Sequence, residues 1–174
     1  NEWVPVPKGG LKTAEFVLVT DASKDRWAAI MICCSSGLTT TMEGDWPTEI
    51  GDAVKSSSVA EPLAVIAAAH TFVDPSARIV VKHVGDNIGS VDEINRGHST
   101  REGRFLAEYL HKHFPRATFT SDRYPGAKIP TDELSRRKAL AQEKLDELLE
   151  TYHLPTGGVI RDLTKMGDPR IPSV

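Results

Sequence analysis

The chain has 174 residues, of which 40% are hydrophobic, and its formal net charge is −3. This length suits one domain whose folding buries about 70% of the unfolded chain's surface, and the composition excludes a wholly disordered chain. No apolar run approaches the roughly 20 residues of a membrane-spanning helix. The opening residues also lack the basic and apolar regions of a signal peptide.

Three strands are predicted first along the chain. The segments AEFVLVTDAS (14–23), RWAAIMICCSS (26–36) and LTTTMEGDW (38–46) are apolar and β-branched, and their short connections favour an antiparallel meander. Asp21 stands at the end of the first strand, where an unpaired buried carboxylate costs several kcal/mol. It therefore needs compensation from a basic side chain, from backbone N–H groups or from a metal ion.

A helix and a central strand follow the meander. The helix is predicted over SSSVAEPLAVIAAAHTFV (56–73), in which Ser58 and Glu61 have the spacing of a capping box. Because Pro62 is acceptable only in the first turn, we expect the helix to begin close to Glu61. The segment ARIVVKHVGDN (77–87) is continuously apolar, which is typical of a central strand, and it ends at Asp86.

The remaining elements complete an α/β pattern. We expect a short helix over 88–97, a helix over 99–114 with Ser99 as N-cap, a strand over 117–124 and a helix from Thr131 to about Tyr152. The order predicts an α/β fold with a mixed five-stranded sheet, in which three antiparallel strands are followed by parallel strands and flanked by helices.

Charge is distributed unevenly along the sequence. Residues 1–95 carry a net charge of −6, residues 96–138 carry +5 and residues 139–174 carry −2. This polarity favours a metal site beside a phosphate-binding surface, the alternative being a solvated face with chance clustering. Phosphate contacts dominate nucleic-acid affinity, and the candidates for such contacts are Arg96, His98, Arg101, Arg104, Lys112 and Arg123.

Four carboxylates form a candidate metal site, namely Asp21, Glu61, Asp86 and Asp132. Two follow strands and two open helices, so that a mixed sheet would bring them to one edge. Carboxylates that lie so close raise one another's pKa unless a cation neutralises them. Two Mg²⁺ ions are the usual solution in phosphodiester hydrolysis. The alternative is that the aspartates are ordinary strand-end or turn residues and that Glu61 is a helix-start charge.

The motifs TDAS, AE, GDN and PTDELSR resemble, in order and spacing, the ribonuclease H domain of retroelement (retrotransposon or retrovirus-like) reverse transcriptases. The resemblance runs from about Val17 to Arg136. It implies a ribonuclease H-like fold over residues 15–152 and metal-dependent hydrolysis of the RNA strand of RNA–DNA hybrids. Residues 1–14 would join an upstream polymerase domain, and residues 153–174 would be a C-terminal tail or linker.

The resemblance also implies roles for the four carboxylates. Asp21 would bridge two Mg²⁺ ions, for which Mn²⁺ is a substitute. Asp132 would complete the site of the ion that activates the attacking water, and Glu61 and Asp86 would hold the ion at the 3′-oxyanion leaving group. One departure concerns the H-x-P-G motif of many members, whose His position is Arg123 here; Arg does not shuttle protons near neutral pH but can hold a phosphate.

Two other functions fit the same residues. One is a non-catalytic domain of this fold, acting as a nucleic-acid or protein-binding scaffold in a larger assembly. The other is an integrase or junction resolvase that cuts DNA, against which the DELSR motif and the four carboxylates argue. The adjacent Cys33 and Cys34 form neither a metal-ligand pair nor a disulfide framework, which indicates a reducing intracellular compartment, cytoplasm or nucleus.

Overall fold

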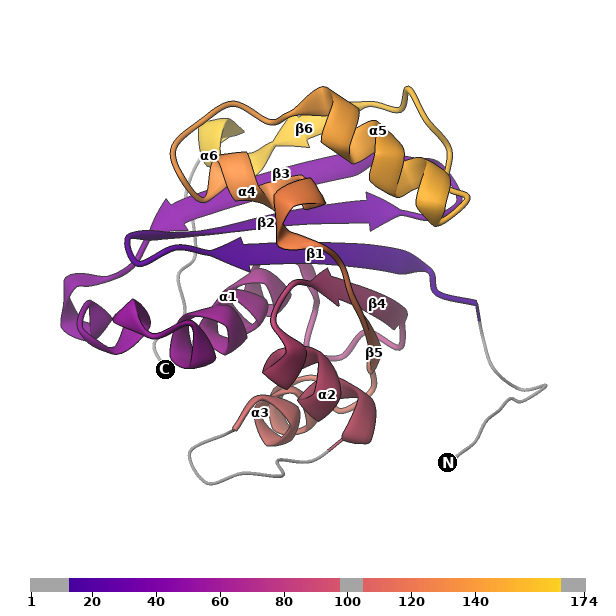
Figure 1. The fold of residues 1–174 in the computed structure, drawn as a ribbon. Helices are drawn as coiled ribbons and strands as arrows, with labels where there is room; N and C mark the ends of the chain where they lie inside the picture. The colour runs from indigo at the N-terminus through magenta and orange to yellow at the C-terminus, as the bar shows by residue number, and fades with distance from the viewer. Residues whose placement is uncertain (1–12, 98–104, 167–174) are drawn as a thin grey trace.

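The computed structural model describes residues 13–97 and 105–166. Its centre is one sheet with the strand order β5-β4-β1-β2-β3-β6 (Figure 1). The strands are β1 (Phe16–Ala22), β2 (Arg26–Cys33), β3 (Thr39–Asp45), β4 (Val80–Gly85), β5 (Thr118–Arg123) and β6 (Ile160–Asp162). The α-helices are α1 (Ser57–Phe72), α2 (Ile88–Arg96), α3 (Leu106–His113), α4 (Thr131–Leu134), α5 (Gln142–Thr151) and α6 (Leu163–Met166). Short 3-10 turns lie at η1 (Thr48–Ile50), η2 (Ala53–Lys55) and η3 (Gly126–Lys128).

The strand directions confirm the expected mixed sheet. Strands β1, β2 and β3 form an antiparallel meander, while β4 runs parallel to β1 and β5 runs parallel to β4. This is the arrangement of a ribonuclease H-like fold. The expected count of five strands is wrong by one, because β6 pairs in parallel with β3. A three-residue edge strand is too short for its alternation of side chains to show in the sequence.

Helices cover both faces of the sheet, with α1, α2 and α3 on one face and α4 and α5 on the other (Figure 1). Alternate strand residues point to opposite faces. Leu18 and Trp27 therefore pack against the α1 side, and Val19 and Ile30 pack against the α5 side. None of the helices in the described part of the chain is long and apolar enough to cross a membrane.

Helix α1 begins earlier than the sequence predicts. It starts at Ser57 with Ser56 as N-cap, so that Pro62 is its sixth residue rather than part of its first turn. The proline nitrogen cannot donate to the carbonyl of Ser58, and the helix continues through the loss because ten of its residues are buried. The predicted capping box does not form, because Glu61 is itself buried and points toward Asp21 and Asp86.

The predicted helix over 131–152 is two helices, α4 and α5. The chain leaves the helical path after Leu134, and Arg137 adopts a left-handed backbone with φ of 63°. No glycine or proline marks this break in the sequence. In α3, helical structure within the described residues begins at Leu106, and the predicted N-cap Ser99 lies outside them.

Candidate metal centre

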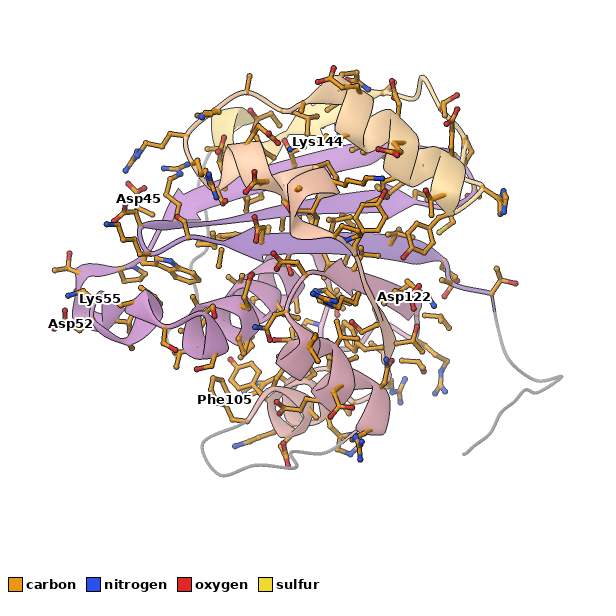
Figure 2. All side chains as sticks on the ribbon, in the orientation of Figure 1. Asp45, Asp52, Lys55, Phe105, Asp122 and Lys144 are labelled. Atoms are coloured by element: carbon orange, nitrogen blue, oxygen red, sulfur yellow. The ribbon has the colours of Figure 1, made fainter. Side chains whose placement is uncertain are left out.

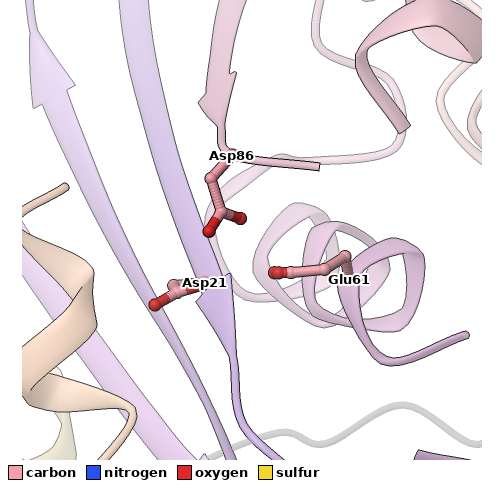
Figure 3. A group of neighbouring side chains, drawn as sticks. All are labelled: Asp21, Glu61 and Asp86. Atoms are coloured by element: carbon pink, nitrogen blue, oxygen red, sulfur yellow. The ribbon is translucent and has the colours of Figure 1, made fainter. Parts of the chain in front are cut away.

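Three of the four predicted carboxylates converge at one end of the sheet (Figure 3). Asp21 is the sixth residue of β1, Asp86 follows the last residue of β4, and Glu61 lies in the second turn of α1. Each contributes one oxygen, and these atoms all lie within 4.8 Å of one another. Asp21 and Glu61 are buried, and Asp86 is half-buried.

The register of the sheet explains why the two aspartates meet. Strands β1 and β4 are parallel and pair Val19 with Val84. Two residues further along each segment lie Asp21 and Asp86, which therefore come side by side. Gly126 leaves room for the second of these carboxylates. A Cβ atom at Gly126 would lie 2.7 Å from Oδ2 of Asp86, closer than side-chain contacts allow.

A buried polar chain holds the strands beneath this cluster. The His83 ring is hydrogen-bonded on one side to Thr20 Oγ1 and on the other to Ser121 Oγ, both at 2.8 Å, which ties β4 to β1 and β5. Burial lowers the pKa of His83 to about 4, so the ring is neutral at physiological pH. His83 is thus a satisfied core histidine that fixes the strand ends rather than a ligand.

Burial and mutual repulsion raise the pKa values of the carboxyl groups in the acid cluster. Burial, and then the charge of Asp86, raise the pKa of Asp21 to about 7. Burial, and then the charges of Asp21 and Asp86, raise the pKa of Glu61 to about 9, while burial also raises the pKa of Asp86. Two of the three groups therefore stay largely or partly protonated near neutral pH in the absence of a cation.

Among the described residues, no basic side chain pairs with the three clustered carboxylates. Across 13–97 and 105–166, none of the three clustered carboxylates forms an ion pair with Lys, Arg or His. Nε of Arg123 donates at 3.4 Å to the backbone oxygen of Asp86, and its charge only partly offsets the raised pKa of that carboxyl. Carboxylate oxygens are the donors that Mg²⁺ prefers. The donor set therefore fits a divalent metal ion.

Asp132 lies beside the cluster without joining the three-residue group. Its charge contributes to the raised pKa of both Asp21 and Asp86. Its own carboxylate pairs with Arg136 at 3.4 Å and approaches Nζ of Lys144 at 3.9 Å. The structure thus brings Asp132 near the three clustered carboxylates and gives it two basic neighbours, Arg136 and Lys144.

Sequence reasoning gave no role to Ser23 and Ser135 in this cluster. The Ser135 hydroxyl lies 3.4 Å from Oδ2 of Asp21, and the Ser135 carbonyl accepts a hydrogen bond of 2.9 Å from Ser23 Oγ. These contacts dock the end of α4 onto the turn that follows β1. Both serines lie within the quoted motifs TDAS and PTDELSR, but only the fold shows that those motifs touch.

The predicted nucleic-acid contacts are dispersed. Arg123 lies at the cluster, whereas Arg96 ends α2, where it pairs with Asp92 at 2.8 Å, and Lys112 is exposed in the last turn of α3. The remaining three candidates, His98, Arg101 and Arg104, lie outside the described residues. Their role in binding stays a prediction.

Comparison with known proteins does not assign the chain to a family. No protein-family model matches the chain, and no curated protein is significantly similar to it in sequence. Among solved structures, ribonuclease H1 from the halophilic archaeon Halobacterium salinarum NRC-1 is similar at 15% identity and a TM-score of 0.42. The match covers 76% of this chain and 98% of that one. A likeness this distant carries no argument, and the fold assignment follows from the strand order described above.

Substitution of Gly126 tests how closely the cluster is built. We expect Gly126→Ala to fold, because the added Cβ meets only the movable end of the Asp86 side chain, and to weaken Mg²⁺ binding roughly ten- to hundredfold as that carboxylate moves. Calorimetric Mg²⁺ titration measures the change. Gly51→Ala is the matched control, since its Cβ would meet one backbone oxygen at 3.4 Å. Unchanged Mg²⁺ affinity in Gly126→Ala would remove Asp86 from the metal site.

Proposed function

We propose that this chain is a metal-dependent endonuclease that hydrolyses the RNA strand of RNA–DNA hybrids. The observation that carries the proposal is the convergence of three carboxylate oxygens within 4.8 Å at the ends of β1 and β4, with no paired cation among the described residues. The motif resemblance supports the choice of substrate. Asp132, from the last of those motifs, is proposed as the fourth member of the site.

In this proposal Asp21, Glu61, Asp86 and Asp132 hold two Mg²⁺ ions, with Mn²⁺ as a substitute. The ions would supply an activated water and neutralise charge at the phosphate. The chain's own part is to fix the carboxylates: β1 and β4 set the two aspartates, α1 sets Glu61, and Ser135 restrains Asp21. Arg123, beside Asp86, would hold a phosphate oxygen and, as a permanent cation, would not carry protons.

The wider context is also proposed from the motifs. We infer that the domain belongs to a retroelement reverse transcriptase, with a polymerase domain upstream in the same polyprotein. Its substrate would then be the hybrid that such a polymerase makes. The basic residues Arg96, His98, Arg101, Arg104, Lys112 and Arg123 are proposed to contact that hybrid.

A second candidate is a non-catalytic domain that binds nucleic acid. The observation that favours it is the position of Asp132, whose carboxylate pairs with Arg136 and approaches Lys144 instead of joining the clustered three. Two Mg²⁺ ions would have to draw that carboxylate away from its partners. A domain of this kind would bind hybrid equally well with and without Mg²⁺.

Cleavage assays separate these candidates. The purified chain is incubated with labelled RNA–DNA hybrid, duplex DNA and duplex RNA, in Mg²⁺, Mn²⁺ or EDTA. We expect the RNA strand of the hybrid to be cut only when a divalent ion is present, with both duplexes intact. Hybrid binding without cleavage in either ion would favour the scaffold, and cleavage of duplex DNA would favour a DNA nuclease.

A further inference from the structure

A polar cleft lies beside α4, away from α2 and α3. It is a cleft of about 470 Å³ between the segment that follows α4 and the strands β2, β3 and β6. This volume falls within the range of about 300–1,000 Å³ typical of ligand sites. Its walls carry three basic side chains, Arg26, Arg137 and Lys138, against the acids Glu43 and Asp162.

The guanidinium groups in this cleft are held in place. Nη1 of Arg26 and Nη2 of Arg137 both donate to Oδ1 of Asp45, at 2.6 and 2.7 Å, and Nη2 of Arg26 pairs with Glu43 at 3.2 Å. Asp45 is labelled in Figure 2. The Arg26 side chain is only 11% exposed, and its buried Nε has no partner among the described residues. Oδ1 of Asp45 thus accepts from both guanidinium groups, and Nε of Arg26 is left without an acceptor among the described residues.

The backbone turn that presents Arg137 is strained. A left-handed conformation, here φ of 63°, costs a non-glycine residue about 1–2 kcal/mol. The turn is closed by the Lys138 amide, which donates to the Glu133 carbonyl at 2.9 Å. It leaves Arg137 63% exposed and places Lys138 on the surface, where its ammonium forms no ion pair within the described residues. Strain of this kind gathers at functional sites.

The cleft adjoins the acid cluster through a chain of contacts. Ser135 touches Asp21, its carbonyl accepts from Ser23 Oγ, and the same Ser23 oxygen accepts from the Arg26 amide at 3.0 Å. Asp21 is paired with Ala28 across the sheet, and Arg26 lies two residues before Ala28 on β2. The side chains of Asp21 and Arg26 therefore lie on the same face of the sheet. A nucleic-acid strand that crosses the cluster toward α4 would next meet Arg137 and Lys138.

We infer that this cleft is a phosphate-binding site for the nucleic-acid substrate, separate from the place of cleavage. The inference rests on the proposed function, since it needs a strand at the acid cluster. Arginine presents a planar fork of donors that matches phosphate oxygens, and lysine adds a point charge. Arg137 and Lys138 contact the phosphate, and the clamp of Arg26 on Asp45 and Glu43 holds the wall behind them.

Binding of hybrid in EDTA, where no cleavage occurs, tests the inference across a series of salt concentrations. The variants are Arg137→Gly, which keeps the left-handed turn without strain, and Lys138→Gln. Each is expected to weaken binding several-fold and to make the plot of log affinity against log salt shallower by about one unit. Arg116→Gln is the control, because this exposed arginine precedes the start of β5, at the opposite end of the sheet from the cluster.

A set of hybrids with single neutral methylphosphonates identifies the contact. Methylphosphonate at one particular position of the hybrid should weaken binding by the wild type and leave binding by Arg137→Gly unchanged. The inference is overturned if both variants have the same salt slope as Arg116→Gln. It is also overturned if inorganic phosphate binds in the cleft but does not change the affinity for hybrid. If the wild type cuts hybrid and both variants bind hybrid normally, the phosphate-binding role of the cleft is refuted and the proposed hydrolysis is not. A wild type that never cuts, with shallower slopes in both variants, refutes only the hydrolysis.

Discussion

Asp21→Asn should abolish cleavage of hybrid, lowering the rate by several orders of magnitude. Asp21 is the central member of the cluster, because its charge raises the pKa of Glu61 and its own pKa responds to both Asp86 and Asp132. Asparagine keeps the size and one oxygen but removes the charge that would hold two divalent ions. The variant should fold, and its metal-free stability should rise, because a buried charge among like charges is lost.

Thermal melting with and without Mg²⁺, together with cleavage, measures this effect. A ligand present at 100 times its dissociation constant stabilises the folded state by about 2.7 kcal/mol, so that the wild type should gain stability in Mg²⁺ and Asp21→Asn should gain far less. Asp52→Asn is the control, since this aspartate is fully exposed. If wild type gains nothing from Mg²⁺ and Asp21→Asn cuts as fast, the metal mechanism is refuted.

Periodicity in the sequence was enough to predict the core of the sheet. Strands β1, β2 and β4 are long and apolar, and their short or helical connections allow few topologies. The errors fall where tertiary contacts override local preference. Pro62 is tolerated inside α1 because burial outweighs one lost hydrogen bond, and the three residues of β6 pair along the edge of β3.

The candidate site was predictable where it depends on strand ends. Asp21 and Asp86 could be placed together because they end strands that the topology makes neighbours. The environment of Asp132 could not be predicted, because it depends on the turn at Arg137 and on Lys144 from α5. Likewise the basic residues Arg136, Arg137 and Lys138 belong to a predicted helix that the structure replaces with a loop over the sheet.

Without metal, the acid cluster should destabilise the protein as the pH rises. Glu61 has a pKa of about 9 in the folded state, against about 4.3 in an unfolded chain. Between these values the folded state holds a proton that the unfolded state has lost, and linkage then makes stability fall with rising pH. For this buried group the slope approaches 1.4 kcal/mol per pH unit. Asp21 adds the same sign between about pH 4 and pH 7.

Other groups oppose this trend. His83, with a folded pKa of about 4, favours stability as the pH rises from about 4 to 6.5, because there the unfolded chain binds the extra proton. The wild type alone therefore shows a mixed profile. Comparison with Glu61→Gln removes the contribution of His83, which the variant keeps. The difference that remains comes from Glu61 and from Asp21, whose pKa depends on Glu61.

Chemical unfolding of wild type and Glu61→Gln in EDTA, from pH 5 to pH 9, provides that difference. We expect the two to be similar at pH 5, where Glu61 is protonated when folded, and the variant to be more stable by several kcal/mol at pH 9. Mg²⁺ should narrow the gap most at high pH, because metal ligands must be deprotonated to bind. A difference that stays constant across the range would show that Glu61 does not carry the buried proton, and the metal would then lose its most strongly perturbed ligand.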